Sequence, residues 1–338
     1  MNDHCIIINS SKIDGNDSLL KSILPEEYFI ALKEDNQKTI PAIAKNPSII
    51  ERLEDYIYDM PSKHILKEGD SRIRLKELPE ESVHLIITSP PYWNLKEYYK
   101  QNGQLGLISD YEEFLWELEK IWKECLRVIV PGGRMIIVVG DVCIPRRVAG
   151  RHIVYPLHSS IQESCRKLGF DNLNPIIWHK ITNAQFEADG NSGRFLGKPY
   201  EPNAVIKNDI EYIIFQRKPG GYRSPSLEKR VLSVVSNKNH REWFQQIWRV
   251  TGASTKQHSA PFPCSLAERL VRMFSFVGDT VLDPFMGSGT TNYAAALWGR
   301  NSIGIEIEPT YFETAKERIN QRLKMRSKSK RLPQLQAV

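Results

Sequence analysis

The sequence predicts an α/β fold with a doubly wound, mainly parallel sheet at its centre. From residue 64 onward, short apolar runs of strand length alternate with amphipathic stretches of helical spacing, and two of these runs end in turns rich in proline or glycine. Such alternation is typical of parallel sheets whose crossover helices cover both faces. With 41% hydrophobic residues among 338, the chain has enough apolar material for a large core.

Residues 1–63 differ in character, and we expect them to form an acidic helical extension. Apolar residues recur at helical spacing between residues 18 and 60, and Pro25, Pro41 and Pro47 are expected to break the helices. The segment carries seven Lys and Arg against eleven Asp and Glu. It can pack on the sheet, contact a second subunit or bind a partner, and we favour packing.

The remaining elements follow in chain order. Strands are expected within seven apolar runs, at 64–70, 83–93, 133–141, 174–180, 209–218, 280–285 and 301–307. Helices are expected at 110–130, near 153–169, at 290–299 and at 310–323. The stretch 217–256 is basic and rich in Ser and Asn, with weak periodicity.

Composition excludes several classes of protein. No run approaches the ~18 consecutive apolar residues of a membrane span, and the N-terminus lacks a basic region followed by an apolar core. We therefore expect a cytoplasmic protein with no membrane contact. The five cysteines are scattered without a CxxC pair, so we expect neither a disulfide framework nor a bound metal.

The net charge of +6 is unevenly distributed. Residues 217–256 hold nine basic and two acidic side chains, and residues 316–331 hold eight basic and one acidic. Two concentrated basic segments suggest a polyanionic partner, although two solvated surfaces would give the same pattern. We expect the tail at 322–331 to be disordered and to add non-specific attraction to phosphates.

A glycine loop follows the strand within 280–285. Gly287 and Gly289 let a ligand approach the backbone at a strand's carboxyl end, where open α/β sheets bind cofactors. Glu306 ends the next strand nineteen residues after Gly287, and its carboxylate can accept both hydroxyls of a ribose. Asn292 replaces the third glycine of a dinucleotide fingerprint, and no P-loop lysine follows, so an adenosine-containing cofactor other than a nicotinamide is favoured. A plain strand-to-helix turn is the alternative.

A Ser-Pro-Pro-Tyr turn ends the strand within 83–93. Pro90 and Pro91 fix the backbone and remove two N–H donors, which leaves carbonyl groups as a rigid set of acceptors. Tyr92 and Trp93 add flat faces beside Ser89. Acceptors beside a stacking face suit an exocyclic amine on a planar base.

In this order the motifs resemble the permuted β class of S-adenosylmethionine-dependent DNA amino-methyltransferases, especially cytosine-N4 enzymes with a TSPPYW motif. The resemblance covers roughly residues 64–325. The matching pieces are Glu68-Gly-Asp70, Ser89–Tyr92, Pro131-Gly-Gly133, His258–Pro263 and Phe285–Gly289. It implies a circularly permuted, seven-stranded methyltransferase sheet with a small target-recognition insert. The implied divisions are a catalytic half at 64–180, a late strand plus the recognition region at 181–256, a cofactor-binding half at 257–325 and a basic tail at 326–338.

The resemblance also implies residue roles. The methionine part of the cofactor would lie against the glycine loop, the ribose against Glu306 and the adenine near Asp70. The residues implied in the loop are Asp283, Phe285, Gly287, Ser288, Gly289 and Thr290. The stretch holding Pro261 and Phe262, which runs into Ser265, would approach the cofactor carboxylate.

The implied chemistry is methyl transfer to a weakly nucleophilic aromatic amine. The Ser89 hydroxyl and the Pro90 carbonyl would accept the amino hydrogens, with Pro91 stiffening the turn. Tyr92 would stack on a base flipped out of the duplex, and Trp93 would share the stacking or belong to the core. Serine at the first position favours cytosine N4, with adenine N6 as the alternative. A non-catalytic nucleic-acid-binding protein on the same fold is a third hypothesis.

The partners implied are double-stranded DNA and a cognate restriction endonuclease, with the chain acting as a monomer or homodimer. Candidate DNA contacts lie in the basic region between the two motifs, at Arg194, Lys198, Arg223, Lys229, Arg230, Lys238 and Arg241. We expect Trp243, Phe244 and Trp248 to share a helical face and form a small core. Cys264 follows proline, as the nucleophile of cytosine-C5 methyltransferases does, but it precedes the glycine loop and is expected to be a packed residue.

Overall fold

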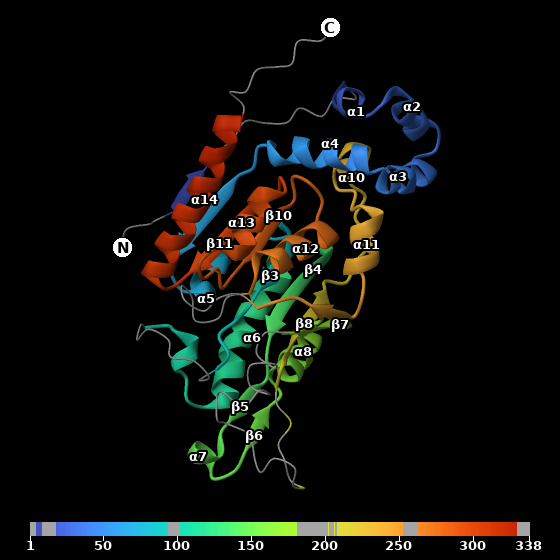
Figure 1. The fold of residues 1–338 in the computed structure, drawn as a ribbon. Helices are drawn as coiled ribbons and strands as arrows, with labels where there is room; N and C mark the ends of the chain where they lie inside the picture. The colour runs from blue at the N-terminus through green and yellow to red at the C-terminus, as the bar shows by residue number, and fades with distance from the viewer. Residues whose placement is uncertain are drawn as a thin grey trace, which may run out of the picture.

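The computed structural model describes residues 5–8, 18–93, 102–180, 202, 206, 208–252 and 262–329. Within these residues, nine strands form one sheet (Figure 1). Their order across the sheet is β1 (Cys5–Ile8), β2 (His64–Glu68), β11 (Asn301–Glu306), β10 (Thr280–Asp283), β3 (Val83–Thr88), β4 (Ile129–Val139), β8 (Ile210–Arg217), β7 (Asp171–His179) and β9 (Ile247–Arg249). All of them except β1 and β8 run in the same direction. The doubly wound, mainly parallel sheet is therefore confirmed.

All seven strands expected from the sequence are present, and β1 and β9 extend the sheet at its two edges. The prediction missed both because the four-residue β1 lies in the segment expected to be helical and β9 spans only three residues. β1 pairs antiparallel with β2 and covers what would otherwise be an open edge.

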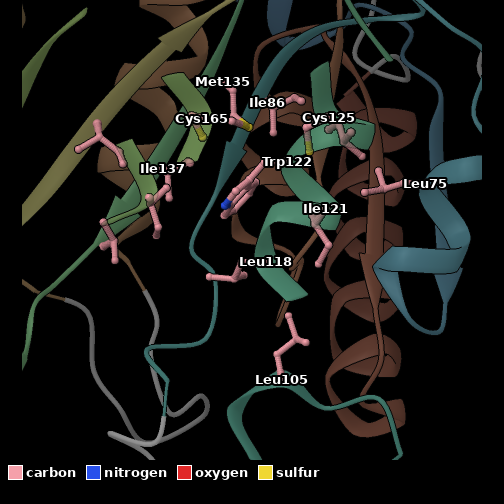
Figure 2. Packing of buried hydrophobic residues seen from close by; sticks show 14 of the residues in the cluster. Leu75, Ile86, Leu105, Leu118, Ile121, Trp122, Cys125, Met135, Ile137 and Cys165 are labelled. Carbon is pink, nitrogen blue, oxygen red and sulfur yellow. The ribbon is translucent and has the colours of Figure 1, made fainter. Parts of the chain in front are cut away.

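Helices cover both faces of the sheet because successive strand residues point to opposite sides. Ile86 packs with α6 (Tyr111–Val128) and α8 (Leu157–Leu168) on one face. Leu85 and Ile87 pack with α12 (Cys264–Phe274) and α13 (Thr290–Leu297) on the other. Figure 2 shows the first face, with Trp122 of α6 beside the strand residues Met135 and Ile137.

In the described part of the chain, four helices precede β2, namely α1 (Ser18–Ile23), α2 (Glu26–Glu34), α3 (Asn36–Lys45) and α4 (Pro47–Tyr58). Their apolar faces form a cluster of their own with Val231, Leu232 and Val277. The N-terminal extension therefore packs against these three residues of the later chain, which agrees with the packing role favoured from the sequence. The expectation that Pro41 breaks a helix is wrong, since Pro41 lies inside α3. The side chain of Asp35 caps the N-terminus of this helix and stabilises it.

The C-terminal helix α14 (Pro309–Ser329) is longer than expected. The expectation that residues 322–331 are disordered is wrong for 322–329, because the helix continues through them and the Arg322 side chain is buried over the ring of Tyr58. Residues 330–338 lie outside the described part of the chain. None of the described helices is long and apolar enough to cross a membrane.

The shorter elements lie around the sheet. They are α5 (Ser71–Arg74), the 3-10 turns η1 (Leu75–Glu77) and η2 (Leu105–Leu107), α7 (Arg146–Ala149), α10 (Leu227–Leu232) and α11 (Asn237–Trp243). Strands β5 (Val142–Ile144) and β6 (Ile153–Tyr155) pair as a separate antiparallel hairpin with α7 at its tip. Figure 1 shows this hairpin projecting at the end of the molecule away from α1–α4.

Candidate active site

The Ser89–Tyr92 turn, named the catalytic turn here for the role that the resemblance implies, and the glycine loop leave neighbouring strands at one point of the sheet. β3 and β10 are adjacent and parallel. The chain leaves β3 toward β4 through α6, and leaves β10 toward β11 on the other side through α13. The connections that leave β3 and β10 therefore run in opposite directions across the sheet. Open α/β sheets bind ligands in the crevice at the carboxyl ends of two such strands.

A buried hydrogen bond ties the two strand ends together. Thr88 Oγ1, the last residue of β3, donates to Asp283 Oδ1, the last residue of β10, at 2.6 Å. The backbone N–H of Phe285 donates to the same oxygen at 3.0 Å. Burial raises the pKa of Asp283 to about 6, and these two donors oppose that rise. Asp283 thus links the end of β3 to the glycine loop.

The glycine loop runs from Pro284 to Gly289 and needs glycine for two reasons. Gly287 and Gly289 adopt the left-handed φ values of 52° and 77°. A Cβ on Gly289 would lie 2.8 Å from the Cβ of Ala315 on α14, so only glycine permits this approach. The glycine loop therefore packs directly on α14.

Glu306 accepts two backbone hydrogen bonds at the end of β11. Gly287 N–H donates to its Oε2 at 2.6 Å, and Glu308 N–H donates to its Oε1 at 2.9 Å. Burial raises the pKa of this carboxyl to about 7. A carboxylate offers about four acceptor positions, so acceptor capacity remains for two ligand hydroxyls.

A cavity of about 690 Å³, its open mouth included, lies between the two motifs. The sequence-predicted residues that line it are Asp70, Ser89, Pro90, Pro91, Phe285, Gly287 and Glu306. Sequence reasoning missed Ser71, Ile307 and Tyr311, which also line it. Of these, only Ser71 carried a signal, as the neighbour of Asp70 in a matched motif.

Asp70 is held at the cavity by its neighbours. Its side chain caps α5 by accepting from Arg72 N–H at 2.9 Å, and it also pairs with the Arg72 guanidinium. Arg72 in turn pairs with Glu117 and donates to the Gly103 carbonyl at 3.1 Å. The guanidinium therefore joins α5, α6 and the segment before η2 into one wall.

Tyr92 and Trp93 are both buried, at 5% and 6% exposure, and neither lines the cavity. Tyr92 O–H donates to Glu211 Oε2 on β8 at 3.1 Å, and the Ser89 hydroxyl donates to Tyr92 Oη at 3.3 Å. Trp93 packs edge-on against Tyr111 and Tyr155 in the core. Of the two roles considered for Trp93, the structure shows the core role.

A family model described as DNA methylase (N6_N4_Mtase) matches residues 83–317, which hold the catalytic turn, the glycine loop and Glu306. The chain belongs to this DNA methylase family.

Individual proteins that are similar to this methylase carry methyltransferase or methylase names as well. M.MjaI, a type II methyltransferase from Methanocaldococcus jannaschii, is 35% identical over 77% of this chain and 92% of that protein. TTHA0409 from Thermus thermophilus, described as a DNA modification methylase and solved in complex with S-adenosyl-L-methionine, is 52% identical, with a TM-score of 0.64 over 77% of this chain and 93% of that one. The cytosine-N4-specific PvuII DNA methyltransferase is 18% identical and has a TM-score of 0.55 over 78% of this chain and 92% of that one, which shows a shared fold alone.

The other described cofactor candidates of the methylase are not among the residues that line the cavity. Arg318 of α14 donates to Thr290 Oγ1 at 3.1 Å and reaches the Ser288 carbonyl at 3.5 Å. Phe262 is buried, and Ser265 lies in the first turn of α12. Pro261 lies outside the described residues.

Cys264 of the methylase is poorly suited to nucleophilic catalysis. Burial raises the pKa of its thiol to about 12, and the carboxylate of Glu268 adds to that rise. The thiol does not line the cavity. Among the residues the structure describes, no group of His, Cys, Asp and Glu side chains is arranged to hold a metal ion.

Three candidate DNA contacts lie at the amino ends of the strands, opposite the catalytic turn. Arg223 makes two hydrogen bonds of 2.6 Å to the buried Asp279, just before β10. Lys229 lies over Gly278, and Arg230 donates to Asn36 of α3 at 3.1 Å. These side chains join the basic region to the sheet and the N-terminal helices, and the structure does not bring them to the catalytic face.

The other candidates remain untested by the structure. Lys238 and Arg241 are exposed on α11, while Arg194 and Lys198 lie outside the described residues. The small core is confirmed for Trp243 and Trp248, whose indole N–H donates to the Trp243 carbonyl at 2.8 Å. A shared helical face is wrong, because Trp248 lies in β9, and Phe244 is 49% exposed.

Sequence reasoning also missed three arginines on the hairpin that follows β4. Arg146, Arg147 and Arg151 are exposed at its tip, and none has a hydrogen bond or ion pair with a described residue. The hairpin starts beside the catalytic turn, because a Cβ on Gly140 would lie 3.5 Å from the Tyr92 ring. The available signal was the lack of any Asp or Glu between Asp141 and Glu163.

Proposed function

We propose that this DNA methylase transfers a methyl group from S-adenosylmethionine to the exocyclic N4 amine of a cytosine flipped out of duplex DNA. The observation that carries the proposal is the single cavity that has Ser89, Pro90 and Pro91 on one side and Gly287 and Glu306 on the other. One cavity thus brings hydrogen-bond acceptors for an amine next to acceptors for a ribose.

The residues present fit the cofactor. Its ribose hydroxyls are donors, and Glu306 keeps acceptor capacity beside a glycine turn. Its sulfonium and amino group are positive, and the described residues that line the cavity include the carboxylates of Asp70 and Glu306 but no Lys or Arg. When bound, S-adenosylmethionine supplies an activated methyl group, so the protein's task is to position the acceptor amine.

Ser89 and Pro90 perform that positioning. The Ser89 oxygen and the Pro90 carbonyl accept the two amino hydrogens, which orients the nitrogen lone pair toward the methyl donor. Pro91 keeps the turn rigid because its ring fixes φ and removes a competing N–H. In this proposal Tyr92, whose side chain is buried, supplies a ring face to the flipped base.

We propose that the hairpin arginines Arg146, Arg147 and Arg151 bind DNA phosphates beside the flipped base. Three exposed guanidinium groups on a projecting arm, without a partner among the described residues, suit backbone contacts, which position a duplex without reading its sequence. Because the arm starts next to Tyr92, such contacts would place the duplex over the catalytic turn.

The chain order supports placement in the permuted β class, since the catalytic turn after β3 precedes the cofactor loop after β10 although the two strands are neighbours. Likeness to type II methyltransferases such as M.MjaI supports a role as the modification enzyme of a restriction–modification system.

The test uses purified protein, methyl-tritiated S-adenosylmethionine and duplex DNA of mixed sequence, followed by digestion to nucleosides and chromatography. Label in N4-methylcytosine is expected. Label in N6-methyladenine would keep the fold and the amine chemistry but overturn the assignment made from Ser89. Adenine N6 is the second candidate because the matching family covers both amines.

A further inference from the structure

A carboxylate lies buried directly behind the catalytic turn. Glu211 of β8 is 9% exposed, and its side chain is held between Tyr92 and Lys180. Its Oε2 accepts from Tyr92 O–H at 3.1 Å, and its Oε1 forms an ion pair with the Lys180 ammonium, which follows β7. Burying a carboxylate costs free energy that an apolar residue would avoid, so the position calls for an explanation beyond packing.

The direction of the hydrogen bonds follows from this carboxylate. A carboxylate only accepts, so the single hydroxyl hydrogen of Tyr92 points to Glu211. Tyr92 then has no hydrogen left for Ser89, and the Ser89 hydroxyl donates to Tyr92 Oη at 3.3 Å. The hydrogen of Ser89 therefore points away from the cavity, which leaves its oxygen lone pairs for a ligand.

We propose that Glu211, paired with Lys180, is a positioning residue that acts through Tyr92 to make the Ser89 hydroxyl an acceptor. This inference rests on the proposed function, because an amine presents hydrogens that only an acceptor can bind. The backbone that follows β4 helps to hold these side chains in place. A Cβ on Gly140 would lie 3.2 Å from Glu211 Cγ and 3.5 Å from the Tyr92 ring, so this backbone packs directly on both.

Glu211→Gln is the decisive variant. It keeps the shape of the side chain, but its amide group can donate to Tyr92, which frees the Tyr92 hydrogen to point to Ser89 and the Ser89 hydrogen to point into the cavity. We expect kcat to fall about tenfold to a hundredfold, the range for a hydrogen bond to a charged group, with the cofactor dissociation constant unchanged within about twofold. The matched control is Asp209→Asn, which alters a neighbouring, partly exposed carboxylate paired with His179 and should leave kcat unchanged.

A double-mutant cycle separates this role from a structural one. In a Ser89→Ala background no hydroxyl remains to be oriented, so Glu211→Gln is expected to change the single-turnover rate less than about twofold. Tyr92→Phe removes the intermediate hydroxyl but keeps the ring, and its effect should likewise not add to that of Glu211→Gln. Thermal melting of each variant verifies that the fold is retained.

The outcomes are distinct. Full wild-type activity of Glu211→Gln, or equal effects of that change with and without the Ser89 hydroxyl, would overturn the inference while leaving the proposed function intact. Wild-type protein that binds S-adenosylmethionine but labels no DNA amine would overturn the proposed function, and the inference with it. A large, non-additive loss of kcat supports both.

Discussion

Thr88 Oγ1 lies 2.6 Å from Asp283 Oδ1, and this one hydrogen bond joins the strand that carries the catalytic turn to the strand that carries the glycine loop. Both side chains are almost completely buried. The bond therefore links the two halves of the active site without solvent competition, and it sets the distance between the cofactor loop and the acceptor turn.

Thr88→Val tests this link because valine keeps the shape of threonine and removes the donor. We expect the free energy of unfolding to fall by about 1–3 kcal/mol, since Asp283 stays buried with fewer donors. Cofactor affinity should fall as well. Denaturant unfolding and calorimetric titration measure the two effects. Thr314→Val, which alters a hydroxyl bonded only within α14, is the control and should change neither quantity; equal behaviour of the two variants would contradict the role given to Thr88.

Burial raises the pKa of Glu306 to about 7 from an ordinary value of 4.5, which predicts pH effects of opposite sign on stability and on binding. Between these values the folded protein holds more protons than the unfolded chain. The contribution of Glu306 to stability is therefore full below about pH 4.5 and is lost as the pH rises to about 7. Cofactor affinity should instead rise over about pH 6 to 8, because the ionised form accepts the ribose hydroxyls better.

Thermal melting of the free protein and calorimetric titration with S-adenosylmethionine measure these two trends. Asp283, whose pKa is raised to about 6, adds a similar stability trend at lower pH, so the comparison with Glu306→Gln isolates Glu306. That variant should lose the Glu306 part of both trends. Identical pH profiles for wild type and variant would rule out Glu306 as the titrating group.

The hairpin arginines are expected to contact phosphates. Changing Arg146, Arg147 and Arg151 together to Gln should lower the slope of log K against log salt by about 2 to 3, because each phosphate contact contributes about 0.9. A fluorescence-anisotropy titration of duplex DNA at several salt concentrations measures the slope. The control removes the same charge from the N-terminal helices through Lys21, Lys45 and Arg52, all exposed. An equal loss of slope in the control would show that only the net charge matters.

Arg223 is expected to stabilise the fold without contributing to DNA affinity. Arg223→Ala removes the ion-pair partner of the buried Asp279, which keeps the Phe276 N–H as a donor, so the free energy of unfolding should fall by about 3–5 kcal/mol. Arg223→Lys keeps the charge but loses the two parallel hydrogen bonds, and an intermediate loss is expected. The salt dependence of DNA binding should stay unchanged in both, and a slope reduced by about 1 in the alanine variant would instead make Arg223 a phosphate contact.

The parts of the fold that could be predicted are those with local signals. The seven strands of the sequence analysis lie in apolar runs that alternate with helical stretches, and the glycine and Ser-Pro-Pro-Tyr turns follow from the backbone restrictions of their own residues. The cofactor side of the site was predictable for the same reason. Asp70 and Gly287 follow strands and Glu306 ends one, and the carboxyl ends of parallel strands meet at one edge.

The rest depends on contacts between residues distant in the chain. Basic composition did not show that Arg223 lies at the edge opposite Ser89, because its partner Asp279 is 56 residues away. Likewise, two aromatic residues after a proline turn resemble a stacking surface, and only the packed structure shows that Tyr92 points to Glu211. Charge and aromaticity can be read from single residues, whereas the role of a charged or aromatic side chain depends on the residues that it contacts in the folded protein.

The closure of the glycine turn by α14 has a consequence for how the protein is made. Tyr311 lines the cavity, Ala315 packs on Gly289 and Arg318 binds Thr290, so the cofactor site is incomplete until these last elements have left the ribosome. A nascent chain that already carries the catalytic turn still lacks this wall. Translation therefore completes the catalytic turn before it completes the cofactor site, and we expect a chain that lacks α14 to bind S-adenosylmethionine weakly.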